Sequence, residues 1–143
     1  MKHPHRLLYL SLPLILLLAY TGISKLLDLK QFSQDLLSQP LPDSLHPLLV
    51  WLLPAAELGA ALLLAWKPQR PFAWWPAFGL MGMFTLYTVL ILSGAFAYVP
   101  CSCGGMLESL SWKEHLLVNS FFCFLSLSGL YLALHQKPPS TRP

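Results

Sequence analysis

The chain has 143 residues, of which 55% are hydrophobic and only 10% are charged, whereas soluble domains carry about 25% charged residues. This composition excludes an ordinary soluble globule and predicts a protein whose main solvent is lipid. The net charge of +3 comes without a basic stripe or an aromatic platform, so nucleic-acid binding is not expected.

Four apolar stretches are long enough to cross a bilayer as helices, because about 20 residues span ~30 Å of hydrocarbon. Barrel strands would alternate in polarity and be about half as long. We therefore expect an all-α membrane protein, a four-helix bundle that forms a single domain over residues 1–143. The expected helices cover residues 7–27, 46–66, 72–98 and 112–135, and the loops 28–45 and 99–111 lie on the same side of the membrane.

The first stretch follows Lys2 and Arg6 and resembles a secretory signal peptide. No Ala-x-Ala cleavage site follows, and the apolar run continues past Gly22, so we expect a retained helix. At its far end Lys25 and Asp28 are three residues apart, which predicts a surface ion pair with the lysine reaching toward the interface.

The next loop contains a short amphipathic pattern. Phe32, Leu36 and Leu37 fall on one side of a helix, which predicts a helix lying on the membrane face. Pro40 and Pro42 end it.

An acidic residue, Glu57, lies near the middle of the second expected helix. A carboxyl group at mid-membrane is costly and by default indicates function, so the site should keep it protonated or paired. Three roles stay open: a hydrogen bond to a quinone carbonyl, a proton relay, or a bond to the backbone carbonyl that Pro54 leaves free.

Small residues in the second and third expected helices predict close helix–helix seams, because small side chains let backbones approach in lipid. They are Ala55, Ala56, Gly59, Ala60, Ala61, Gly79 and Gly82.

Two cysteines, Cys101 and Cys103, follow the third stretch and precede Gly104 and Gly105. A disulfide between them would close a small, strained ring, and strain makes such a bond an oxidant rather than a staple. The glycines give a partner's sulfur room to approach. A redox-active pair, an inert disulfide and a soft-metal site all stay open.

The fourth expected helix begins just after Ser111, because Ser111 and Glu114 form a capping-box pattern. His115, Asn119 and Cys123 then share one face. We expect His115 to lie within reach of the two cysteines, where it could bond a thiolate, carry a proton or bind a metal. Cys123 lies deeper and is expected to serve packing.

The distribution of positive charge predicts the orientation. Lys and Arg without acids occupy the N-terminus, the second loop and the C-terminus, whereas the loops 28–45 and 99–111 also contain acids. The positive-inside rule then places both termini in the cytoplasm. It places Cys101 and Cys103 outside, where disulfides persist.

Three groups of residues together resemble the MauE family of DoxX-like membrane proteins. They are Tyr20–Asp28 with Phe32, then Glu57–Gly59, then Pro100–Gly105 followed by Ser111, Trp112, His115 and Asn119. The resemblance covers about residues 7–135, and its most specific part is the Cys-x-Cys-Gly-Gly segment with the Trp and His after it. It implies a bacterial inner-membrane bundle that helps disulfide-rich periplasmic proteins to mature, such as the small subunit of methylamine dehydrogenase. It also implies a periplasmic thioredoxin-like partner.

The favoured function is thiol–disulfide exchange as a disulfide oxidoreductase, in which Cys101 and Cys103 cycle between dithiol and disulfide with the help of His115. By analogy with other bundle oxidoreductases, a membrane quinone is the other expected electron partner, contacted by Glu57 and Tyr20. One alternative is a non-enzymatic membrane chaperone whose cysteines only brace a loop. The other is a metal-handling protein that uses both cysteines and His115 as ligands.

Overall fold

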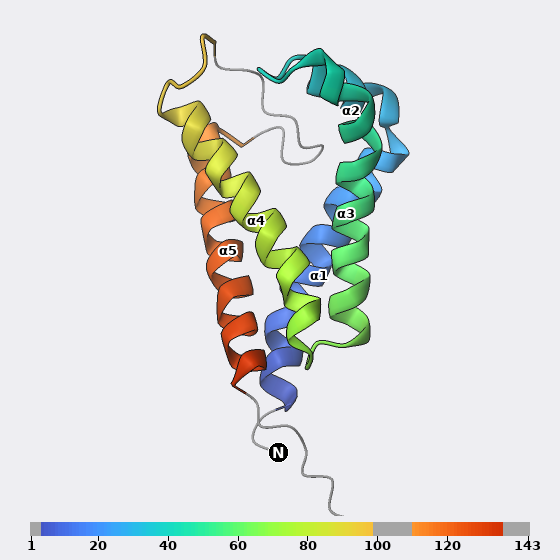
Figure 1. Cartoon of the computed structure of the whole chain (residues 1–143), viewed down its shortest axis with the longest axis vertical. Coiled ribbons are helices and arrows are strands. Elements are labelled where there is room, and N and C mark those ends of the chain that lie inside the picture. The colour runs from blue at the N-terminus through green and yellow to red at the C-terminus, as the bar shows by residue number, and fades with distance from the viewer. Residues whose placement is uncertain (1–3, 99–109, 136–143) are drawn as a thin grey trace, which may run out of the picture.

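The computed structural model describes residues 4–98 and 110–135, and within them every regular element is a helix (Figure 1). The elements are α1 (Pro4–Leu27), α2 (Leu29–Leu37), the 3-10 turn η1 (Asp43–Leu45), α3 (His46–Trp66), α4 (Pro71–Leu92) and α5 (Trp112–Leu134). Four of them, α1, α3, α4 and α5, are long and apolar enough to cross a membrane. The expectation of an all-α fold with four such helices is confirmed.

The bundle is built from two helix pairs. Helix α1 packs mainly on α3, and α4 packs mainly on α5, while α3 with α4 and α1 with α5 join the pairs. In Figure 1 the α4–α5 pair and the α2–α3 side separate toward the end of the bundle that carries α2. We call this the α2 end, and the opposite end, where α3 turns into α4, the turn end.

The main hydrophobic core lies at the turn end. It draws on residues 7–18 of α1, the first half of α4 and the second halves of α3 and α5, which meet there because the helices are antiparallel. Its members are Leu7, Leu14, Leu18, Ala60, Ala61, Leu64, Ala73, Trp74, Ala77, Leu80, Met81, Leu130 and Ala133. A separate small cluster, of Phe32, Leu36 and Val50, holds α2 on α3.

Among the described glycines, Gly22 and Gly129 come closest to another helix, and the sequence pattern had not singled them out as seams. A Cβ atom at Gly22 in α1 would lie 2.8 Å from Leu58 Cγ and 3.3 Å from the Pro54 carbonyl oxygen. A Cβ atom at Gly129 in α5 would collide with the ring of Trp74. These positions therefore set how near α1 comes to α3 and α5 to α4.

The small residues predicted as seams behave differently from one another. Ala60 and Ala61 are buried in the core, as predicted. At Gly59, Gly79 and Gly82, however, a Cβ atom would meet nothing within 4 Å among the described residues. The prediction is wrong for these three glycines, because no other helix among the described residues packs against them.

Helix α4 ends at Leu92, six residues before the end predicted from hydropathy. Gly94 adopts a left-handed φ of 74°. The N–H of Gly94 donates to the Ile91 carbonyl (3.3 Å), and the N–H of Ala95 donates to the Leu90 carbonyl (3.2 Å). This is a Schellman stop, which an apolar run hides because the residues after it are apolar too.

The short helix α2 lies where the amphipathic pattern predicted it. Phe32 and Leu36 are buried against Val50, whereas Leu37 is 56% exposed. The buried face of α2 is therefore one residue narrower than the predicted apolar face. Ser38 caps the helix directly after Leu37.

Candidate functional site

A buried ion pair joins α1 to α3. Lys25 Nζ donates to both carboxylate oxygens of Glu57, at 2.8 and 3.0 Å. Glu57 is 1% exposed, and the Lys25 side chain is 16% exposed. The lysine is thus the more accessible member of the pair, and the carboxylate lies behind it.

The surroundings of the pair explain how it fits between two helices. Gly22, three residues before Lys25, lets α1 approach α3 at Pro54, a proline inside that helix. Lys25 Nζ also lies 3.4 Å from the Thr21 carbonyl oxygen and 5.7 Å from the centre of the Phe32 ring. A backbone dipole and an aromatic face therefore supplement the ionic contact.

The ion pair confirms that Glu57 is paired and contradicts the predicted pair between Lys25 and Asp28. An isolated charge at mid-membrane costs about 2.5–3.5 kcal/mol on the insertion scale, and Glu57 meets this cost by pairing. The predicted Lys25–Asp28 pair is wrong, because Lys25 turns toward α3. Asp28 instead caps α2, accepting from the Gln31 N–H at 3.0 Å.

The ion pair bears on the three roles left open for Glu57. Both of its oxygens accept from Lys25, so its described partner is a lysine rather than the carbonyl freed by Pro54. Tyr20, the other expected quinone contact, is half-buried in α1, five residues before Lys25. Quinone contact and proton relay remain proposals for these side chains.

Cys101 and Cys103 lie outside the described residues. The chain on either side of them is described, and both flanks belong to the α2 end, since α4 ends there and α5 begins there. The predicted capping box is confirmed: the Glu114 N–H donates to Ser111 Oγ (3.4 Å), and the Ser111 N–H donates to Glu114 Oε2 (2.6 Å).

His115 is half-buried in the first turn of α5. Its Nδ1 lies 3.3 Å from the Ser111 carbonyl oxygen, and its ring centre lies 5.9 Å from that of Trp112. This placement gives the imidazole a local backbone partner, next to the segment that carries the two cysteines in the sequence. Its predicted role toward them stays a prediction.

The rest of that α5 face packs against α4. Asn119 Nδ2 donates to Thr88 Oγ1 (3.2 Å), and Thr88 in turn donates to the Phe84 carbonyl (2.7 Å). Cys123 is half-buried against the main core. Its environment agrees with the expected packing role.

A polar contact that the sequence pattern missed links α2 to α4. The Tyr87 hydroxyl donates to Gln39 Oε1 at 2.6 Å, and Gln39 is 4% exposed. The Tyr87 ring also lies 6.2 Å from Phe96 and 6.4 Å from Trp112, between ring centres. No signal in the sequence distinguished Gln39 from the polar residues just before it, Gln34, Asp35 and Ser38, and only its burial shows that it needs a partner.

A metal centre and a cavity are two further candidates for a site. Within residues 4–98 and 110–135, no three His, Cys, Asp or Glu side chains come together as a metal centre requires. Two of the three ligands in the metal alternative, Cys101 and Cys103, lie outside that range, so the alternative stays a prediction.

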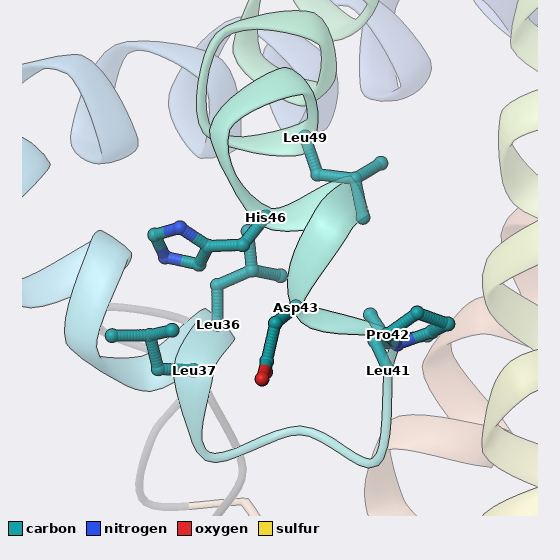
Figure 2. A pocket seen from close by; sticks show the side chains of 7 residues that line it. All are labelled: Leu36, Leu37, Leu41, Pro42, Asp43, His46 and Leu49. Atoms are coloured by element: carbon teal, nitrogen blue, oxygen red, sulfur yellow. The ribbon is translucent and has the colours of Figure 1, made fainter.

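A small cavity lies beside η1, and Figure 2 shows that its walls come from the end of α2, the loop after it and the start of α3. It is lined by Leu36, Leu37, Leu41, Pro42, Asp43, His46 and Leu49. At about 10 Å³ it has room for about one water molecule. It is too small for a cofactor.

Comparison with known proteins supplies one match. The family model described as methylamine utilisation protein MauE matches residues 5–132. No curated protein and no solved structure matches the chain.

Proposed function

Because this chain is a multi-pass membrane protein that belongs to the MauE family, we propose that it is a thiol–disulfide oxidoreductase supporting the maturation of periplasmic proteins. The observation that carries the proposal is the Cys101-Ser-Cys103-Gly-Gly segment, placed by the sequence between α4 and α5. The third cysteine of the chain, Cys123, lies 20 residues beyond Cys103, so this segment is where the sequence brings two thiols together.

The proposed chemistry is dithiol–disulfide exchange. One thiolate of the reduced pair attacks the disulfide of a thioredoxin-fold partner and forms a mixed disulfide. The second thiolate of the pair then attacks the bridging sulfur and releases the partner as a dithiol. Two electrons and two protons pass from the Cys101–Cys103 pair to the partner, and the steps reverse when the partner is the reductant. His115, as a base near the segment, would favour the thiolate form.

The proposed location is the bacterial inner membrane, with both termini in the cytoplasm. Charge asymmetry supports this orientation, since Lys67 and Arg70 occupy the turn end without a nearby acid. The α2 end, where the cysteine segment joins α4 and α5, would then face the periplasm.

A membrane quinone is the proposed second electron partner. In the direction in which the partner dithiol reduces the Cys101–Cys103 disulfide, the quinone would then take two electrons and two protons from the reduced pair and leave as a quinol. Glu57 and Tyr20 are the proposed contacts. The geometry that supports this is a charged, hydrogen-bonding pair inside a helix bundle, with Lys25 holding the Glu57 carboxylate.

A trapped mixed disulfide tests the proposal. Cys103→Ser removes the resolving thiol, so Cys101 should accumulate as a covalent adduct with a periplasmic thioredoxin-fold protein on a non-reducing gel. The double variant Cys101→Ser/Cys103→Ser should form no adduct, and Cys123→Ala, the matched control, should leave the adduct of the Cys103→Ser protein unchanged.

Other results would contradict the proposal and identify the competing function. A Cys101–Cys103 disulfide with a potential below about −300 mV and no adduct would indicate a structural brace. Stoichiometric metal after mild purification, lost in Cys101→Ser, would indicate a metal-handling protein.

A further inference from the structure

The two ends of the bundle are held by different kinds of contact. The turn end contains the main core, to which all four long helices contribute. At the α2 end the buried cluster belongs to α2 and α3, and the two helix pairs separate there (Figure 1). Contacts that cross between the pairs at this end therefore have a large effect on their separation.

Helix α2 follows α1 directly, and α2 together with the turn after it is attached to the bundle at three points. Near its start, Phe32 packs over Lys25 Nζ. In its middle, His46 Nε2 lies 2.9 Å from the Ser33 carbonyl oxygen and 3.2 Å from Ser33 Oγ. These two attachments connect α2 to the α1–α3 pair.

The third attachment crosses to the other pair. Gln39 lies in the turn after α2, where its Nε2 donates to the Asp35 carbonyl at 3.2 Å. Its Oε1 accepts the 2.6 Å bond from Tyr87 of α4. The Tyr87 ring lies beside Trp112 of α5, so this residue contacts both members of the α4–α5 pair.

We propose that α2 is a strap across the α2 end of the bundle and that the Tyr87–Gln39 hydrogen bond fastens it to the α4–α5 pair. Breaking this bond lets the two pairs move apart at the α2 end while the core holds them at the turn end. The bond is short and its acceptor is buried, where low dielectric makes it stronger than in water. Helices α4 and α5 are also the ones that flank the proposed thiol pair in the sequence, but the strap stands on the helix contacts alone.

Distance measurements between spin labels test the strap. In a full-length background with Cys101→Ser, Cys103→Ser and Cys123→Ala, labels are attached through Leu37→Cys in α2 and Leu117→Cys in α5, both exposed positions. Tyr87→Phe removes only the hydroxyl. It should lengthen and broaden the distance distribution at the α2 end, in detergent and in nanodiscs. Gln39→Leu should do the same, and the double variant should add little, because both changes break the same Tyr87–Gln39 bond.

Two controls make the result specific. Tyr131→Phe removes the hydroxyl of an exposed tyrosine near the turn end and should leave the distances unchanged. A second label pair at the turn end, through Trp66→Cys and Leu134→Cys, should report the same distance with and without Tyr87→Phe. The strap is refuted if Tyr87→Phe leaves the α2-end distribution unchanged, or if it loosens both ends equally.

Discussion

At the scale of single residues, the ion pair is the feature with the largest energetic consequence. Lys25 and Glu57 are each costly in a bilayer, and each meets that cost through the other. Removing one partner leaves the other as a buried charge without compensation, which is worse than removing both. The two side chains should therefore behave as a unit.

A double-mutant cycle measures this dependence. Lys25→Leu and Glu57→Leu should each lower the free energy of unfolding in micelles by about 3–5 kcal/mol, whereas the double variant should recover much of that loss. Lys30→Leu, at an exposed lysine of α2, is the control and should change stability little. Additive losses in the double variant would show that the two charges are not coupled.

The same cycle separates structure from function. If Glu57 takes part in proton-coupled electron transfer, the double leucine variant should fold and yet oxidise thiols slowly, because leucine cannot titrate. Normal thiol oxidation in that folded variant would assign the pair to stability alone.

Glycines give a second test at the residue scale. Gly129→Ala should destabilise the protein by about 1–3 kcal/mol, because its Cβ would collide with the buried ring of Trp74. Gly79→Ala is the matched control in a neighbouring helix. It has open space and should be neutral or raise stability by up to about 1 kcal/mol. Thermal unfolding in detergent compares them, and equal losses would contradict the assignment of Gly129 as the seam.

At the scale of elements, local signals define where the helices begin and end. The Ser111–Glu114 box starts α5, Asp28 caps α2, and Gly94 ends α4. Each signal satisfies backbone groups that a helix end leaves free. The start of α5 bears on the proposed function, because it fixes the first helical turn, which contains His115.

The capping box can be tested on its own. Ser111→Ala should cost about 1 kcal/mol of stability and fray the first turn of α5. Ser120→Ala, at an exposed position inside the same helix, should be neutral or slightly stabilising because alanine favours helix. Hydrogen exchange of the amides of Trp112 to His115 should rise only in the first variant. Unchanged exchange there would mean that other contacts hold the turn.

At the scale of the whole molecule, the orientation decides which compartment the thiols reach. A membrane-impermeant maleimide should label Cys101 and Cys103 in intact, reduced spheroplasts, because positive charge gathers at the turn end. Cys123, half-buried within α5, serves as the internal control and should stay unlabelled. If labelling of Cys101 and Cys103 required a broken membrane, the proposed orientation would be wrong.

The sequence by itself determined those features that depend on residues close together along the chain, such as where helices lie and where they begin. Length and hydropathy predicted four membrane-spanning helices, the amphipathic pattern predicted α2, and the serine–glutamate spacing predicted the start of α5. The MauE resemblance, confirmed over residues 5–132, came from short motifs. Gly94 shows the limit of hydropathy, because an apolar helix and an apolar turn have the same composition.

Only the tertiary structure decided which residues meet across helices. It paired Glu57 with Lys25 instead of leaving Lys25 to Asp28, made Gly22 and Gly129 the seams, and joined Tyr87 to Gln39. Such contacts depend on the rotation and relative depth of each helix, which follow from packing along its whole length. A pattern within one helix shows which residues share a face, but the neighbouring helix determines what that face touches.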